Sequence, residues 1–321
     1  MKKKLLKIGI IGTNEGNGHP ISFSSIFNGY NKKYLKKFCK FNLINEYLPK
    51  YHKNKKSNII PNAKVTCIWT QSRKKSYEIS KISNINHICK SIEEMSKKVD
   101  AVILARDDIE NHLKFSKIFL KKDIPIFIDK LIVHDKKSLK IFNTKSKNKL
   151  YMSCSSARYT RLIEKIQKER STIKKETAFI IGHSKKNWLR YAYHLLEGIV
   201  KIFGYDIQKV RCLTAKKDKN EIYQLIYKNG LNVSLFFSDR IFLPIKFTCL
   251  KKNSKALEVP YEDYFFSIKK MMQEFETMVR TGKMPISKKK MVDLSKIVIA
   301  GNLSKNNKNQ FYSVEKLKVT K

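Results

Sequence analysis

Residues 100–130, DAVILARDDIENHLKFSKIFLKKDIPIFIDK, contain two short apolar runs joined by a segment of helical periodicity. The runs at 100–105 and 124–128 are nearly continuous in apolar residues, which is typical of strands buried on both faces of a parallel sheet. Apolar residues of 110–121 recur three and four positions apart and predict an amphipathic helix. The order strand, helix, strand predicts a βαβ unit, from which parallel sheets are built.

The sequence before this stretch extends the same alternation. Residues 5–11 and 65–70 are apolar, with β-branched and aromatic residues, and predict two more strands. Residues 76–81 and 92–98 have helical periodicity. We therefore predict an α/β fold that begins with a doubly wound, dinucleotide-binding Rossmann domain over 1–150.

The second half has a different pattern. Longer, partly alternating strands and longer helices predict a separate α+β domain over 151–321, with a largely antiparallel sheet, for substrate binding and oligomerisation. Residues 31–62, rich in Lys, Tyr and Asn, make the first crossover unusually long and predict an insertion. In the second domain we predict strands at 178–181, 231–237 and 241–250, helices at 193–203 and 265–279, a loop at 304–310 and a last strand within 311–319.

The chain is strongly basic. It carries 68 Lys and Arg against 27 Asp and Glu, a formal net charge of +41 over 321 residues. Such a charge attracts polyanions, so nucleic acid and acidic membrane surfaces have to be considered as partners. The lysines are spread over almost every segment, which favours a solvated basic surface over a nucleic-acid site.

Signals for a membrane, an export route or a metal are missing from the sequence. No apolar stretch is long enough to span a bilayer, and Lys7 interrupts the apolar run that follows the basic start. The six cysteines lack the short spacings of metal and redox motifs. We predict a cytoplasmic protein with free thiols and no bound metal.

A glycine-rich turn, IGIIGTNEGNGHP at 8–20, follows the first strand. In the dinucleotide-binding fingerprint G-x-G-x-x-G, glycines allow a tight turn and a close approach of the backbone to pyrophosphate. Here the first glycine fits, an Asn stands at the second position and the later glycines are displaced. Asn tolerates the left-handed conformation, and amides near the next helix start can still bind phosphate. The candidate cofactor contacts of the turn are Gly12, Thr13, Asn14, Gly16, Gly18 and His19.

The end of the second strand bears on the choice of cofactor. An acidic side chain there binds the ribose hydroxyls of NAD, whereas residues 70–74 offer hydroxyls and cations without a carboxylate. Ser72 and Arg73 therefore favour the 2′-phosphate of NADP, and NAD remains the alternative.

Residues 100–142 resemble the Gfo/Idh/MocA oxidoreductase family, in which a strand, a helix with a histidine and a strand ending in Glu-Lys-Pro follow in this order. On this resemblance His112 matches the helix histidine and Lys130 the catalytic lysine. Asp129 replaces the usual Glu, and Leu131 replaces the usual Pro.

Three segments of the second half resemble the same family. WLRYAYHLLEGIVKIFG, from Trp188, is similar to a segment in which an Asp and a His stand four residues apart at a helix start. His194 matches the histidine, whereas Arg190 occupies the position of the acid. SSARY at 155–159 is similar to the Arg-containing domain junction, and residues 281–304 to the C-terminal helix.

The resemblance implies a hydride transfer between NAD(P) and a sugar, nucleotide sugar or polyol, in a protein that forms homodimers or homotetramers through the sheet of its second domain. Lys130 would hydrogen-bond the reacting oxygen and stabilise alkoxide charge, and His194 would be the acid or base. We expect His112 either to contact the ligand or to have a structural role only. The other candidate cofactor contacts are Ala105, Arg106, His112 and Asp129, and the candidate substrate contacts are Arg158, Arg190 and Tyr191.

Two other functions remain open. Arg190 and Leu131 favour a non-catalytic dinucleotide-binding sensor or assembly protein of the same fold. A nucleic-acid-associated protein is the third interpretation, and its binding would fall steeply with rising salt, unlike binding in a nicotinamide pocket.

Overall fold

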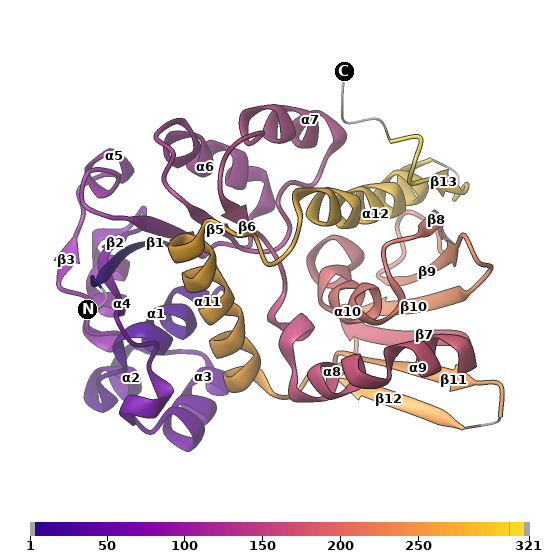
Figure 1. The fold of residues 1–321 in the computed structure, drawn as a ribbon, viewed down its shortest axis with the longest axis horizontal. Helices are drawn as coiled ribbons and strands as arrows, with labels where there is room; N and C mark the ends of the chain where they lie inside the picture. The colour runs from indigo at the N-terminus through magenta and orange to yellow at the C-terminus, as the bar shows by residue number, and fades with distance from the viewer. Residues whose placement is uncertain (1–3, 254, 308, 318–321) are drawn as a thin grey trace. The chain divides into compact units, whose positions relative to one another are not determined.

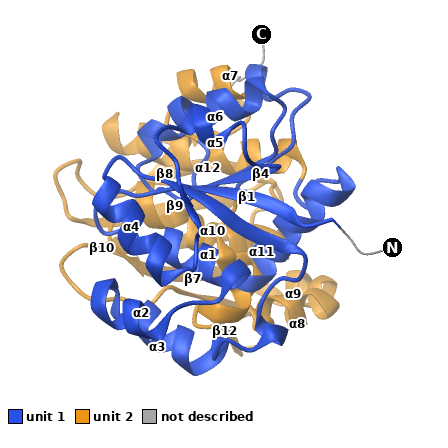
Figure 2. Cartoon of the chain, turned by 90° about the vertical axis from the view of Figure 1, so that its left-hand side faces the viewer, with its two compact units in different colours: residues 1–132, 144–153, 268–286 blue, residues 133–143, 154–267, 287–321 orange. Residues whose placement is uncertain are grey.

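The computed structural model describes residues 4–253, 255–307 and 309–317 (Figure 1). The chain divides into two compact units, coloured separately in Figure 2. The sequence predicts consecutive domains, whereas each unit is assembled from three segments. The first unit comprises Met1–Ile132, Thr144–Ser153 and Ile268–Ile286, and the second comprises Val133–Asn143, Cys154–Ser267 and Ser287–Lys321.

A six-stranded parallel sheet with strand order β3-β2-β1-β4-β5-β6 forms the core of the first unit (Figure 1). The central strand β1 pairs with β2 on one side and with β4 on the other. Its residues Ile8, Ile10 and Ile11 are fully buried, as expected for a strand covered on both faces. The strands are β1 (Leu6–Ile11), β2 (Ala63–Trp69), β3 (His87–Ile88), β4 (Ala101–Leu104), β5 (Ile126–Ile128) and β6 (Tyr151–Met152).

Helices alternate with these strands along the chain. The helix after β2 begins earlier than its periodicity predicts, because the Ser72 hydroxyl accepts a hydrogen bond from the amide of Lys75 and caps the first turn. The helices are α1 (His19–Asn28), α2 (Lys32–Phe38), α3 (Asn42–Tyr47), α4 (Arg73–Ile82), α5 (Ile92–Met95) and α6 (His112–Lys121), while α7 (Lys136–Lys145) and α11 (Tyr264–Thr281) each have residues in both units.

The insertion at 31–62 contains α2 and α3, followed by a π-helical turn at Leu48–His52 and a 3₁₀ turn at Lys56–Asn58. Asn31 caps α2 through its side-chain oxygen, which accepts from the amide of Tyr34.

The last part of α11 belongs to the first unit although it lies far along the sequence. The ring of Phe275 is fully buried and meets Phe127 of β5 edge to face, with 5.9 Å between ring centroids. The Arg280 guanidinium donates hydrogen bonds to the carbonyls of Lys4 and Asn62, at 3.2 and 2.6 Å. These contacts attach the helix to the sheet by apolar packing at its middle and hydrogen bonds at its end.

A seven-stranded mixed sheet with strand order β12-β11-β7-β10-β9-β8-β13 forms the second unit. β7 and β10 are parallel, and the other neighbours are antiparallel. The strands are β7 (Thr177–Lys185), β8 (Ile207–Cys212), β9 (Asn220–Tyr227), β10 (Asn232–Ser238), β11 (Lys246–Lys251), β12 (Ala256–Pro260) and β13 (Tyr312–Ser313).

Two long helices of the second unit pack closely through one tryptophan. The Trp188 indole donates to the carbonyl of Val298 at 2.8 Å and stacks on Tyr223. A Cβ at Gly301 would lie 2.5 Å from the same indole, so only glycine fits this contact. The helices of this unit are α8 (Arg161–Ile166), α9 (Arg170–Glu176), α10 (Trp188–Phe203) and α12 (Lys288–Asn306).

The predicted fold class is confirmed, with local differences. β11 begins only at Lys246, so the strand predicted at 241–250 is shorter. The loop predicted at 304–310 is wrong at its start, because α12 continues to Asn306, and the Asn306 and Asn307 side chains donate to carbonyls of its last turn. Within the predicted last strand β13 is formed, and residues 318 and 319 lie outside the described residues.

None of the helices in the described part of the chain combines the length and the apolar character that a membrane span requires.

Candidate functional site

The glycine turn after β1 is fixed by backbone geometry at three positions. Gly16 has a φ of 74°, which favours glycine, and a Cβ at Gly12 would lie 2.6 Å from Cγ of Pro20. Gly18 is the N-cap of α1, and a Cβ there would lie 2.5 Å from Cδ1 of Ile44 in the insertion. The turn therefore packs closely against Pro20 at its start and against the insertion at its end.

The backbone amides of this turn fit a phosphate. In the described part of the chain, no protein group accepts a hydrogen bond from the amides of Thr13, Asn14, Gly16 or Gly18. Oδ1 of Asn17 accepts from the amide of His19 at 2.7 Å, while the N-cap Gly18 has no side chain to cap the helix, and the positive end of the helix dipole lies there. Unpaired amides at a helix start are the usual binding site for pyrophosphate.

Side chains from the ends of β2 and β4 hold the turn in place. Nη1 of Arg106 donates to the carbonyl of Thr13 at 3.1 Å and to Oε1 of Gln71 at 2.9 Å, and the Gln71 amide donates to the same carbonyl. Oδ1 of Asn14 accepts from the amide of Asp107 at 3.1 Å. The three strand ends thus share one hydrogen-bonded network.

The Asp108 carboxylate and the His112 ring also contact Arg106. Its guanidinium pairs with Asp108 at 2.5 Å, and its carbonyl lies 2.8 Å from Nε2 of His112. Nδ1 of the same ring lies 2.6 Å from the carbonyl of Leu131. Carbonyl oxygens only accept, so both bonds form together when both ring nitrogens carry a proton. His112 and Ala105 are fully buried, and their contact with a cofactor remains a prediction.

The end of β2 presents cations to solvent. Arg73 and Lys74 form the exposed first turn of α4, and Ser72 is its N-cap. The Thr70 hydroxyl donates to the carbonyl of Ser72 at 2.6 Å and shapes this turn. The end of β2 suits a phosphate, because exposed cations and the start of α4 lie together there.

Asp129, the residue directly after β5, pairs with two basic side chains, His19 of α1 and Lys130. Its Oδ2 lies 2.5 Å from Nδ1 of His19 and 3.6 Å from Nζ of Lys130. The carboxylate and the lysine are both buried, with 2% and 7% of their surface exposed. Burial raises the pKa of Asp129, but His19 and Lys130 outweigh this and hold the pKa of the carboxyl well below its usual range. The predicted residues His19, Asp129 and Lys130 are thus brought together.

The second unit contributes a histidine held by a hydroxyl. Nδ1 of His194 and Oγ of Ser155 are hydrogen-bonded at 2.6 Å. The imidazole stacks on Tyr261, with 5.6 Å between centroids, and lies tilted against Tyr191 at 5.3 Å. Lys130 belongs to the first unit and His194 to the second.

The predicted arginines have different surroundings. Nη1 of Arg158 donates to Glu197 at 3.0 Å and to the hydroxyl of Tyr205 at 3.1 Å, inside the second unit. Burial raises the pKa of Glu197 and the guanidinium opposes this shift. Arg190 is exposed on the first turn of α10, which Asn187 caps. Contacts of both arginines with substrate remain predictions.

Several partners of these residues are not predicted from the sequence. Gln71 and Asp107 lie one and two residues after the ends of predicted strands, so their places at the sheet edge are a usable signal. Ser155 lies in the quoted junction segment, but its bond to His194 spans 39 residues and no local pattern indicates it. Tyr261 is also far from His194 in the sequence, so no local pattern indicates that the two rings stack.

Known proteins resemble this chain in structure and not in sequence. No family model and no curated protein matches its sequence. Among solved structures, scyllo-inositol dehydrogenase from Lactobacillus casei aligns with a TM-score of 0.75 at 12% identity, over 98% of this chain and 100% of that one. Myo-inositol 2-dehydrogenase from Lactobacillus plantarum aligns with a TM-score of 0.73 at 12% identity, over 97% and 99%. Myo-inositol dehydrogenase from Lactobacillus casei, in complex with NAD(H) and myo-inositol, aligns with a TM-score of 0.71 at 12% identity, over 96% of both chains.

These alignments extend over both units and show the fold. The chain has a Rossmann-like parallel sheet and a mixed, mostly antiparallel sheet, and its alignment with these dehydrogenases covers both.

We expect the Asp129 carboxylate to make the free energy of unfolding depend on pH in the acidic range. A carboxyl whose pKa is lower in the folded than in the unfolded state stabilises the fold above the unfolded pKa, and this contribution is lost as the pH falls below about 4. Asp129→Asn should flatten this acid dependence and, at neutral pH, lower the free energy of unfolding by about 3–5 kcal/mol, because buried cations lose their partner. Urea unfolding at several pH values measures both effects. Asp123→Asn, at an exposed ion pair, is the control and should keep the wild-type slope.

Proposed function

We propose that the chain is an NAD(P)-dependent oxidoreductase of the Gfo/Idh/MocA type, which transfers a hydride between nicotinamide and a hydroxyl or ketone of a sugar-like substrate. The observation that carries this proposal is the group at the carboxyl ends of β1 and β5, where the open amides of the turn and the Asp129–Lys130 pair are found. Ligands of open α/β sheets bind at this edge. The structural neighbour that holds NAD(H) and myo-inositol supports a polyol among the candidate substrates.

NADP is the proposed cofactor, with NAD as the alternative. The amides of the glycine turn would hold its pyrophosphate, and Ser72 and Arg73 would hold the 2′-phosphate, since no carboxylate stands at the end of β2 to bind a ribose diol. When bound, the nicotinamide supplies the hydride chemistry that no side chain of the protein can provide.

Lys130 is proposed to act on the reacting oxygen of the substrate. Its ammonium is buried and faces one carboxylate, so it retains donors for a second acceptor. A positioned cation in a site with little water stabilises the alkoxide that develops as the alcohol is oxidised. Asp129 pairs with this ammonium and orients it.

His194 is proposed as the group that takes or returns the hydroxyl proton. An imidazole titrates near neutral pH, which suits this role. The Ser155 hydroxyl and the Tyr261 ring fix the plane of the imidazole, and Arg190 and Tyr191 on the same helix are proposed contacts of the substrate. Arg190 stands where the resemblance implies an acid, and this favours the alternative of a non-catalytic sensor or assembly protein. Binding of cofactor without turnover of any polyol would support that alternative.

We expect NADPH to bind in the micromolar range and more tightly than NADH. Calorimetric titration at about 0.15 M salt measures this, since nonspecific attraction to the basic surface is screened there. Arg73→Asp should abolish the preference for NADPH by placing a carboxylate against the 2′-phosphate. Lys81→Asp makes the same charge change at the far, exposed end of α4 and should leave binding unchanged. Failure of both nucleotides to bind would overturn the proposed function.

Lys130→Met should lower kcat for polyol or sugar oxidation by about 10²–10³, because it removes the cation that stabilises the alkoxide. NADPH affinity should change much less. Steady-state kinetics with a panel of polyols and sugar derivatives measures the effect. Lys121→Met, at an exposed position of α6, is the matched control. A Lys130→Met protein with wild-type kcat would exclude this lysine from the chemistry.

A homodimer or homotetramer is proposed to form through the open face of the second sheet. We use this name for the face lined by Ile181, Ile222, Phe236 and Leu243. Ile181 of β7 and Ile222 of β9, the two strands that flank β10, are 43% and 38% exposed and leave apolar surface open on this face. Pairing of two such faces would remove this apolar surface from water.

Ile222→Glu should shift the protein to the monomer, because a carboxylate would be buried at the contact between subunits. Light scattering coupled to gel filtration measures the mass. Leu43→Glu introduces the same change at an exposed position of the first unit and should keep the oligomer. A monomeric wild type would rule out this assembly.

A further inference from the structure

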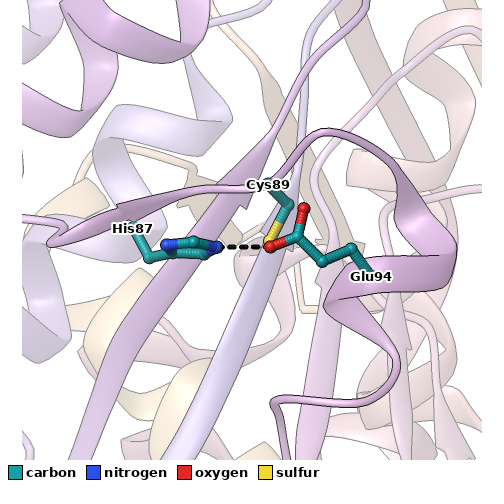
Figure 3. Close-up of side chains that lie close together, drawn as sticks. All are labelled: His87, Cys89 and Glu94. Atoms are coloured by element: carbon teal, nitrogen blue, oxygen red, sulfur yellow. Dashed lines mark hydrogen bonds and ion pairs between the residues drawn. The ribbon is translucent and has the colours of Figure 1, made fainter.

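Three potential metal ligands gather at the edge of the first sheet, on and beside β3 (Figure 3). They are His87 of β3, Cys89 directly after it, and Glu94 of α5, and their donor atoms all lie within 4.8 Å of one another. Nε2 of His87 is 2.6 Å from Oε1 of Glu94. Cys89 is buried, and the other two are partly exposed.

Local structure determines this arrangement. His87 and Cys89 are alternate residues of one extended segment, so their side chains point to the same side. The amide of Cys89 donates to the carbonyl of Ile68 at 2.9 Å and extends the pairing with β2. Glu94 lies in the first turn of α5, and the amide of Lys90 donates to its Oε2 at 2.7 Å. Hydrogen bonds therefore fix the backbone at Cys89 and the carboxylate of Glu94.

A second thiol stands beside the cluster. Cys67 of β2 is the register partner of His87, and both Cys67 and Cys89 are free cysteines. A hydrogen bond joins the side chains of Cys67 and Cys89. Cys67 is outside the group of donor atoms that lie within 4.8 Å of one another, and it adjoins that group through Cys89.

We propose that His87, Cys89 and Glu94 bind a zinc-type divalent cation, with Cys67 as the fourth ligand. Thiolate and imidazole ligands select zinc and its chemical relatives over magnesium and calcium, which prefer oxygen alone. Four protein ligands from one small region are typical of a structural zinc site. The site is separate from the proposed hydride transfer and does not depend on it.

The geometry needs only a small contraction. Ligands about 2.0–2.3 Å from a tetrahedral zinc are roughly 3.3–3.8 Å from each other. The donors at up to 4.8 Å would move inward by about 1 Å while the bond between His87 and Glu94 opens. His87 and Glu94 side chains are 44% and 26% exposed, so they have room to turn and the cation has a path from solvent.

The charges of the site balance. Two thiolates and one carboxylate around a divalent cation leave a net charge of −1. Nζ of Lys98 lies 3.9 Å from Oε1 of Glu94 and supplies the compensating charge. A bound cation would tie the two-residue edge strand β3 to both β2 and α5, where backbone pairing alone is short.

Cobalt substitution tests the site directly. The reduced protein is freed of metal with a chelator and titrated with Co²⁺, and Zn²⁺ is then added. We expect one equivalent of Co²⁺ to give the visible bands of a tetrahedral ion and a thiolate charge-transfer band, and Zn²⁺ to displace it. Mg²⁺ should have no effect.

Variants assign the ligands. Cys89→Ser and Cys67→Ser should each weaken the charge-transfer band, and His87→Gln and Glu94→Gln should each lower the affinity by at least about ten-fold. Cys39→Ser removes another buried thiol of the same unit and should bind like the wild type. The proposal is overturned if the wild type binds no Co²⁺ at micromolar concentration, or if Cys89→Ser binds it equally well. An unchanged spectrum of Cys67→Ser would remove that residue from the ligand set.

Thermal unfolding provides a second readout that does not depend on the serine variants folding. Zn²⁺ should raise the Tm of the wild type, because it binds the native state, and should not raise that of His87→Gln, whose altered side chain is partly exposed. Equal shifts in both proteins would count against the site.

Discussion

Parallel pairing of β1 with β2 and β4 determines where each candidate group of the first unit lies. The three strands run in one direction, so their carboxyl ends meet, and the chain after each strand reaches the same edge. Thr13 follows β1, Gln71 follows β2 and Arg106 follows β4, and these three residues share hydrogen bonds. A shift of one register position would turn the apolar side chains of β1 away from their neighbours, so the core and the turn depend on the same pairing.

Charge compensation is the second constraint on this chain. Acids are scarce, with 27 against 68 basic residues, and most cations have to remain in water. Among the described residues, the buried arginines and lysines are the exceptions, and each has an acid: Asp108 for Arg106, Asp129 for Lys130 and Glu197 for Arg158. The acid next to a buried cation therefore identifies a position at which the fold holds a charge in place, whereas the number of lysines does not. This distinction separates Lys130 from the many lysines around it.

Local patterns in the sequence were sufficient to predict the inner strands of the first sheet. Continuous apolar runs gave these four strands to within two residues, because strands buried on both faces must be apolar along their whole length. The two-residue strands β3 and β6 were missed, since neither has a run long enough to detect. Contacts that span many residues were missed as well. Cys67 and His87 become neighbours only through the register of β2 and β3, and no spacing rule for metal ligands reveals such a pair.

Leu131 and Arg190, the two departures from the pattern that the sequence resembles, differ in their structural surroundings. Leu131 is buried, and its carbonyl lies against the His112 ring, so the segment after β5 is supported by packing and a hydrogen bond without the usual proline. Arg190 is exposed on the first turn of α10, and its charge is opposite to that of the acid it replaces. A substrate alcohol beside this helix would meet a donor instead of an acceptor. Under the proposed function, this position suits a substrate group that bears a phosphate or carboxylate, because a guanidinium donates hydrogen bonds and cannot accept them.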